Sequence, residues 1–307
     1  MAVAKVRQIR RRIKTVQSTK KITRAMELIA ASRIVKAQQR VAAARPYAEQ
    51  ITKVIANLTA AGASLDHQLL VTREPVRRVG FVVITADRGL AGGYNSNVIR
   101  LAERRAAEEM AAGREVTFVP VGKKGQGYLK YRGHPFDRSY VGMSDTPSFQ
   151  DAAEVAAHVM ELYAAEQVDI VEIISTQFLS SFTQRPSARR LLPLEPPTPP
   201  AGAAGADATD TGPQASYEFE PEPEGILDRL LPRYVEARLF AAMLDSAASE
   251  HAARQRAMKT ATDNAEELIE TLTRVANRAR QAEITTEIME IVGGAEALTQ
   301  AAAAEEK

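Results

Sequence analysis

Residues 241–275 read AAMLDSAASEHAARQRAMKTATDNAEELIETLTRV, and this stretch decides the fold. Small or apolar residues, together with His251, Gln255 and Thr262, recur three or four positions apart in it. They are Ala241, Leu244, Ala248, His251, Gln255, Met258, Thr262, Ala265, Leu268, Leu272 and Val275. A spacing near 3.5 residues, kept over many turns, predicts a helix with a narrow seam that winds around a partner in a left-handed supercoil. The same spacing reaches back to Leu227 and forward to Met289.

A partner of the right kind lies at the other end of the chain. Residues 3–58 predict one long helix, interrupted only by Pro46, with no glycine before Gly62. Residues 1–60 hold 14 Lys and Arg against two acidic residues, whereas residues 263–307 hold ten acidic and four basic residues. Ends of opposite charge attract each other, so the two helices are expected to pair antiparallel.

Between the helices the sequence changes from helical spacing to short apolar runs. Alternating strands and helices predict a parallel sheet with right-handed crossovers. The expected strands are 79–85, 115–121, 136–141 and 169–176, followed by a strand pair within 178–194; the expected helices are 97–112, 123–131 and 148–166, the last capped by Ser148.

The predicted fold class is therefore α plus α/β. A long antiparallel left-handed coiled coil of N- and C-terminal helices carries an inserted, Rossmann-like α/β sheet domain. The expected domains are a coiled-coil helix over 1–60, the α/β domain over 76–194, a Pro/Ala/Gly-rich loop over 195–224 and a second coiled-coil helix over 225–300. Pro232 is expected to kink or start that last helix, and Gly293-Gly294 to weaken its end.

Few patterns in the chain indicate chemistry. The absence of cysteine excludes disulfides, thiolate metal sites and cysteine catalysis. No G-x-x-x-x-G-K-[ST] motif exists, and the glycines of 122–127 fit a strand-to-helix turn better than a nucleotide site. None of the four histidines stands at metal-ligand spacing from another. We therefore predict no catalytic residue, no cofactor and no metal.

Two segments remain open on physical grounds alone. Residues 87–97, DRGLAGGYNSN, follow the first expected strand, where doubly wound sheets bind ligands. Their glycines, with Asn or Ser capping the next helix, equally suit a tight turn. The basic residues of 7–14 suit either an anionic partner or nucleic acid. His251, on the seam, is expected to serve packing or register.

Three blocks carry a resemblance to a known family. Residues 9–32 (IRRRIKTVQSTKKITRAMELIAAS), 87–97 and 284–295 (ITTEIMEIVGGA) resemble the gamma subunits of rotary, F-type ATP synthases, in family order and over nearly the whole chain. The Ala- and Pro-rich tract resembles actinobacterial members. Ala91 stands where many members have cysteine, and the chain lacks the paired cysteines of the chloroplast redox switch.

The resemblance implies a central-stalk rotor subunit without catalytic activity of its own. Its partners would be the alpha and beta subunits, the epsilon subunit and the c ring, with no nucleic acid. It would lie peripherally at the cytoplasmic side of the cell membrane, held there only through the complex. Proton flow would turn the c ring and this shaft, and the shaft would drive ATP synthesis or hydrolysis in the alpha-beta hexamer.

The resemblance also implies contact residues. The expected rotor–stator contacts are Met26, Arg254, Arg280, Gln281, Thr285, Glu287 and Glu290. A loop contacting a beta subunit would use Asp87, Arg88, Gly89, Gly92 and Gly93. Contacts to the c ring or epsilon would use Tyr217, Phe219 and Glu220. The alternatives to the rotor are a coiled-coil nucleic-acid-binding adaptor and an α/β enzyme with a helical hairpin for oligomerisation.

Overall fold

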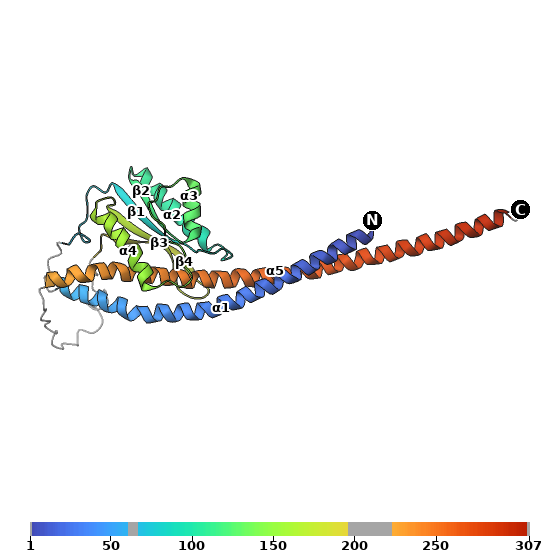
Figure 1. Ribbon diagram of the computed structural model, residues 1–307, viewed down its shortest axis with the longest axis horizontal. Helices are drawn as coiled ribbons and strands as arrows, with labels where there is room; N and C mark the ends of the chain where they lie inside the picture. The colour runs from blue at the N-terminus through green and yellow to red at the C-terminus, as the bar shows by residue number, and fades with distance from the viewer. Residues whose placement is uncertain (1, 61–66, 196–222, 306–307) are drawn as a thin grey trace, which may run out of the picture. The chain divides into compact units, whose positions relative to one another are not determined.

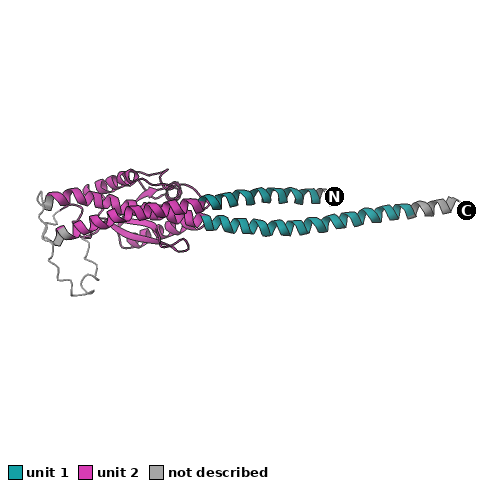
Figure 2. Cartoon of the chain, turned by 90° about the horizontal axis from the view of Figure 1, so that it is seen from below, with its two compact units in different colours: residues 1–29, 255–307 teal, residues 30–254 magenta. Residues whose placement is uncertain are grey.

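In the computed structural model of the chain, residues 2–60, 67–195 and 223–305 are described. These residues form two compact units, coloured separately in Figure 2. Unit 1 comprises residues 1–29 and 255–307, and unit 2 comprises residues 30–254. The elements are α1 (Ala2–Ala60), β1 (Arg78–Ile84), α2 (Tyr94–Ala111), β2 (Glu115–Val121), α3 (Lys123–Arg132), α4 (Phe149–Ala164), β3 (Ile170–Phe178), β4 (Gln184–Leu192) and α5 (Pro223–Glu305).

Both terminal helices are confirmed, and both tolerate residues that usually break helices. α1 runs for 59 residues through Pro46, and α5 runs for 83 residues through Pro232. The expectation that Pro232 starts the helix is wrong, because α5 begins at Pro223. Gly293 and Gly294 also lie within α5. Proline costs about 3 kcal/mol in a helix interior, so packing along these helices must supply more than that.

In unit 1 the first part of α1 lies beside the middle of α5. Lys20 Nζ is 2.7 Å from Glu266 Oε1, and the Thr23 and Thr262 hydroxyls are 2.8 Å apart. Residue numbers rise along one helix as they fall along the other, so the two segments run antiparallel. Both threonines are buried. The ion pair joins the basic and acidic ends of the chain in the way that the charge asymmetry predicts.

Unit 2 contains a four-stranded mixed sheet in the order β2-β1-β3-β4. β1 is parallel to both of its neighbours, with Val82 opposite Val119 on one side and Ile173 on the other. β4 is antiparallel to β3 and closes one edge of the sheet. The expected parallel pairing is found for β1, β2 and β3, and with the antiparallel β4 the sheet as a whole is mixed.

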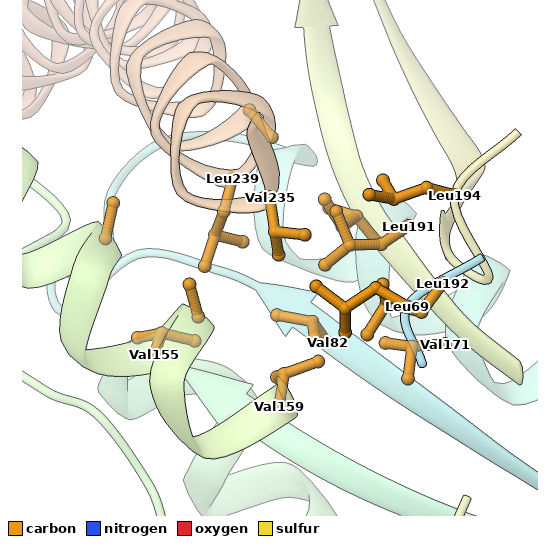
Figure 3. Close-up of a cluster of buried hydrophobic side chains, with 14 of the residues drawn as sticks. Leu69, Val82, Val155, Val159, Val171, Leu191, Leu192, Leu194, Val235 and Leu239 are labelled. Carbon is orange, nitrogen blue, oxygen red and sulfur yellow. The ribbon is translucent and has the colours of Figure 1, made fainter. Parts of the chain in front are cut away.

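The two faces of this sheet are covered by different helices (Figure 1). Val79, Phe81 and Val83 point to the face covered by α2 and α3, whereas Val82 and Ile84 point to the face covered by α4, α5 and the end of α1. This alternation is the period of two that a strand imposes. Figure 3 shows Val235 and Leu239 of α5 packed over Val82, with Val155 and Val159 of α4 beside them.

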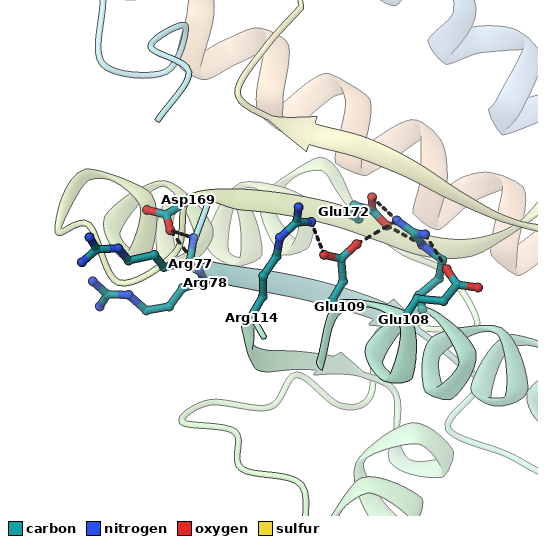
Figure 4. A network of polar contacts seen from close by, with 8 residues as sticks. Arg77, Arg78, Glu108, Glu109, Arg114, Asp169 and Glu172 are labelled. Carbon is teal, nitrogen blue, oxygen red and sulfur yellow. Dashed lines mark hydrogen bonds and ion pairs between the residues drawn. The ribbon is translucent and has the colours of Figure 1, made fainter. Parts of the chain in front are cut away.

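Charged side chains in the second half of α2 join this helix to the sheet (Figure 4). Arg105 of α2 donates from Nη2 to Glu172 Oε1 of β3 at 2.9 Å and also bonds to Glu108. Glu109 pairs with Arg114. Separately, Asp169 Oδ2 accepts the backbone N–H groups of Arg77 and Arg78 at 2.8 Å each, which joins the start of β1 to β3.

Of four local predictions, one is confirmed and three are wrong. Ser148 caps α4 as expected, in a capping box with Asp151. The strand expected at 136–141 is wrong, because the chain there makes only a single bridge between Tyr140 and Val121. The strand pair expected within 178–194 is one strand, β4, because β3 itself extends to Phe178. Asn and Ser do not cap α2; Gly93 holds the N-cap position without a side-chain bond.

Candidate functional site

The turn that follows β1 is built around the carboxylate of Asp87. Its oxygens accept the backbone N–H groups of Lys123 (3.0 Å), Gly142 (2.9 Å) and Ser144 (3.1 Å). Burial by itself raises the pKa of Asp87, but the three backbone donors together with the Ser144 hydroxyl outweigh it, so the pKa lies below its usual value. Asp87 thus joins three loops at the carboxyl edge of the sheet.

Thr85 and Gly122 fix the neighbouring turn between β2 and α3. The Thr85 hydroxyl donates to Val121 O at 3.0 Å and accepts from Gly125 N at 2.8 Å. Gly122 has a φ of +98°, and a Cβ placed on it would lie 2.2 Å from Thr85 O. Only glycine fits such a position. The glycine cluster of 122–127 is therefore a strand-to-helix turn, with its donors used inside the chain.

A buried ion pair of α5 holds the Asp87 turn from the other side. Arg254 Nη2 lies 2.7 Å from Glu250 Oε1 and 3.2 Å from the carbonyl oxygen of Gly89. Glu250 is 1% exposed. Burial raises the pKa of Glu250, and Arg254 opposes this rise by favouring the charged form. Arg254, predicted as a rotor–stator contact, thus has two partners within its own chain.

A second polar cluster lies about one helical turn away, around the buried His251. His251 Nε2 is 3.2 Å from Asp145 O, and Asp145 also forms an ion pair with Arg33 of α1. Burial lowers the pKa of His251, because it disfavours the charged imidazolium. α1, α5 and the loop before α4 therefore meet at Asp145. The packing role predicted for His251 agrees with this geometry.

Of the remaining residues of the 87–97 segment, some are buried or hydrogen-bonded within the chain and others are exposed. Asn95 Oδ1 accepts Ala86 N at 2.9 Å, and Tyr94 is buried beside α5. Arg88, Gly92 and Gly93 are exposed. Leu90 is also exposed and has a φ of +62°. The polar groups of this turn are directed largely to the chain itself, which favours the tight turn over a ligand site.

The other predicted contacts belong to unit 1 or lie outside the described residues. In unit 1, Met26 is half-buried on α1. The candidates on α5 are all exposed: Arg280, Gln281, Thr285, Glu287 and Glu290. Thr285 donates its hydroxyl proton to Gln281 O at 2.9 Å, the usual bond of a helical threonine. Tyr217, Phe219 and Glu220 lie outside the described residues.

Sequence reasoning missed the residues that hold the turn in place. Thr85, Asp145 and Glu250 were not candidates, because nothing in their spacing relates them to their partners. Asp145 and His251 are 106 positions apart.

Comparison with known proteins gives the family. The family model described as ATP synthase matches residues 5–298. The chain is similar to the ATP synthase gamma chain of Frankia casuarinae, with 54% identity over 95% of this chain and 97% of that one. It is also similar to the ATP synthase gamma chain of Thermobifida fusca, with 49% identity over 99% of each.

Solved structures agree at the level of the fold. A chain from the central stalk and c ring of the Tetrahymena thermophila mitochondrial ATP synthase matches with a TM-score of 0.59 and 26% identity, covering 78% of this chain and 99% of that one. A chain from the Euglena gracilis mitochondrial enzyme matches with a TM-score of 0.66 and 17% identity, covering 96% and 95%. Helical termini around a central mixed sheet are thus the arrangement found in ATP synthase stalks. With a family match over almost its whole length, the chain belongs to the ATP synthase gamma chains.

Proposed function

We propose that this chain is the central rotor shaft of an F-type ATP synthase. It would couple proton-driven rotation of the c ring to ATP synthesis and hydrolysis in the hexamer of alpha and beta subunits. The observation that carries the proposal is the identity of about half of all residues to gamma chains along almost the full length. The catalytic sites of such an enzyme lie on the beta subunits, so this chain is a non-catalytic part.

The geometry suits a part that transmits torque. Within unit 1 the antiparallel helices are joined by the Thr23–Thr262 hydrogen bond and the Lys20–Glu266 ion pair. We propose that the seam continues as a left-handed coiled coil, since its apolar spacing averages near 3.5 residues. We propose likewise that the sheet domain is Rossmann-like, and that the domain limits are those inferred from the sequence.

Shaft orientation would select the state of each catalytic site. A body that has no threefold symmetry, standing inside a ring of three beta subunits, presents a different face to each of them. Differential contact energy with two or more conformations is what shifts a conformational equilibrium. Each beta subunit would therefore bind, condense or release according to the angle of the shaft.

The proposed contacts follow from exposure and family position. Arg280, Gln281, Thr285, Glu287 and Glu290 lie exposed along α5, where a surrounding partner can reach them. Met26 is their proposed counterpart on α1. For Arg254 we propose an indirect role. It holds the Gly89 carbonyl, and the exposed Arg88, Gly92 and Gly93 of the same turn would meet a beta subunit.

The remaining partners are proposed from the family. The epsilon subunit and the c ring would contact the sheet domain and residues 217–220. None of the helices in the described part of the chain is long and apolar enough to cross a membrane. We propose that the complex places the chain peripherally, on the cytoplasmic side of the cell membrane.

Reconstitution tests the proposal directly. Alpha and beta subunits of the same organism are assembled with and without this chain, and ATP hydrolysis is measured. If the chain is the rotor, it should raise sustained ATP hydrolysis and co-purify with the hexamer. Unchanged hydrolysis would refute it. Tight DNA or RNA binding with a steep salt dependence would instead indicate the nucleic-acid adaptor, which none of the relatives named above supports.

A further inference from the structure

Unit 2 contains an apolar groove between α1, α5 and the first residue of α4. Its volume is about 490 Å³. Alanines from both long helices, Ala44 and Ala48 on α1 and Ala237 and Ala241 on α5, line it and leave this space open. Sites for small molecules commonly enclose about 300–1,000 Å³ and are lined mainly by apolar and aromatic groups with a few polar ones. The groove has the size and the lining of such a site.

Three aromatic rings line the groove. The Tyr47 and Phe149 rings meet edge to face with centroids 6.4 Å apart, and Phe149 meets Phe240 in the same way at 5.6 Å. The rings come from three different helices, so their arrangement depends on the tertiary fold. Tyr47 is 51% exposed, which leaves the groove accessible. Aromatic faces attract organic cations as well as apolar groups.

One carboxyl group also lines the groove, that of Asp245 on α5. Among the described residues it has no hydrogen bond or ion pair. Arg45 of α1, the other charged residue in the lining, is already bound to Glu49 by a 2.7 Å contact. Arg189 of β4 acts on Asp245 only from a distance. The groove thus offers an unpartnered acid beside aromatic rings and alanines.

We infer that this groove is a binding site for a small lipophilic amine. The apolar body of the ligand lies among Tyr47, Phe149 and the alanines, and its ammonium group meets the Asp245 carboxylate. An anionic ligand is disfavoured by the same carboxylate, and a neutral ligand leaves it without a partner.

The site is expected to depend on pH through Asp245. Burial raises the pKa of Asp245 to about 6, and the positive charge of Arg189 lowers it in part. Above this value the carboxylate is charged and attracts the ammonium group. As the pH falls through this value the carboxyl group becomes neutral, so the affinity for an amine decreases.

A matched pair of probes tests the inference with the purified full-length chain. Binding of 4-phenylbutylamine and of 4-phenylbutan-1-ol is measured by calorimetry at pH 7.5 and pH 5. The two probes share their apolar body and differ in charge. We expect the amine to bind about tenfold more tightly than the alcohol at pH 7.5, as charge-assisted hydrogen bonds exceed neutral ones. This advantage should shrink at pH 5.

Two variants locate the site. Asp245→Asn keeps the shape and should reduce the affinity for the amine to that of the alcohol. Ala241→Phe fills the groove and should remove both probes, with circular dichroism confirming that helix content is kept. Asp263→Asn, an exposed acid elsewhere on α5, is the control and should change neither affinity. Equal binding of both probes, amine binding that survives Asp245→Asn, or binding of neither probe would overturn the inference.

Discussion

Arg254 of α5 donates a hydrogen bond from Nη2 to the carbonyl oxygen of Gly89, 3.2 Å away. The two residues are 165 positions apart in the sequence, and the bond holds the turn after β1 against the helix. Arg254 is also paired with Glu250, which is almost completely buried. A residue that we propose as part of the rotor–stator contact therefore also organises its own chain.

Replacing Arg254 should cost stability as well as coupling. Arg254→Ala leaves the buried Glu250 without its charge partner, which typically destabilises by about 3–5 kcal/mol. Urea unfolding of the full-length chain measures this change. Arg280→Ala, on the exposed surface of α5, is the control and should change the unfolding free energy by less than about 0.5 kcal/mol. Similar values for both variants would show that the Arg254 bonds contribute little to stability.

The Glu250→Gln variant distinguishes the contribution of the Glu250–Arg254 ion pair to stability from that of the Arg254–Gly89 hydrogen bond. In the double variant Glu250→Gln, Arg254→Ala, no buried charge is left without a partner. The loss should therefore be smaller than the sum of the two single losses, by about 0.5–3 kcal/mol. Additive losses would argue that Arg254 acts mainly through Gly89.

Gly122 should not tolerate a side chain. Alanine there would meet Thr85 O at 2.2 Å with a φ of +98°, so backbone must move. We expect Gly122→Ala to lower the unfolding free energy by about 1–3 kcal/mol or more. Gly127→Ala is the matched control, because it lies exposed in α3 with nothing within 4 Å of its added Cβ. That variant should be neutral or up to about 1 kcal/mol more stable. Equal effects would contradict the crowding at Thr85.

The Thr23–Thr262 hydrogen bond should show coupling across the two helices of unit 1. Replacing either threonine with valine leaves the other hydroxyl buried with one partner fewer, which costs about 1–2 kcal/mol. Replacing both leaves no unmet hydroxyl, so the double variant should lose less than the sum. Thermal unfolding of the four variants measures this cycle. Strict additivity would mean that the bond is too weak to fix the register.

Stability at acid pH should depend on Asp87. Its folded-state pKa is lowered, so its contribution is present above the unfolded value of 3.8 and is lost as the pH falls through the folded value. Asp87→Asn should be less stable than the parent at pH 6, and the gap should narrow as the pH falls below about 4. Unfolding free energies between pH 2 and 6 measure this, with Asp263→Asn as the exposed control. A gap independent of pH would exclude the carboxylate charge as its source.

Met26→Lys should impair coupling more than assembly. The change puts a charge on the half-buried position proposed to face the beta subunits. Protons pumped per ATP hydrolysed, measured in vesicles containing the complex, should fall while the yield of complex stays the same. Ala25→Lys adds the same charge about 100° away around the helix and should have less effect. A normal ratio in Met26→Lys would contradict the proposed contact.

Much of the fold could be read from regular spacing. The spacing of three and four residues predicted both terminal helices, and the run 79–85 predicted β1, because these patterns repeat locally and bury one face of one element. The strand predicted at 136–141 is wrong because such a short segment has no repeating pattern of this kind. Tyr140 pairs with Val121 only as an isolated bridge, and a run of six residues carries no local mark that separates a strand from an extended loop.

The sequence by itself determined the long helices, most of the strands, the opposite charges of the two ends and the family. These properties depend on residue spacing and composition within a segment. Only the tertiary structure decided that Asp87 joins three loops, that Arg254 points to Gly89, and that four alanines and Asp245 enclose a groove. Each of these depends on the meeting of side chains from segments that lie far apart in the chain. Local sequence patterns do not indicate these contacts, because the free energy that stabilises them comes from packing the whole unit.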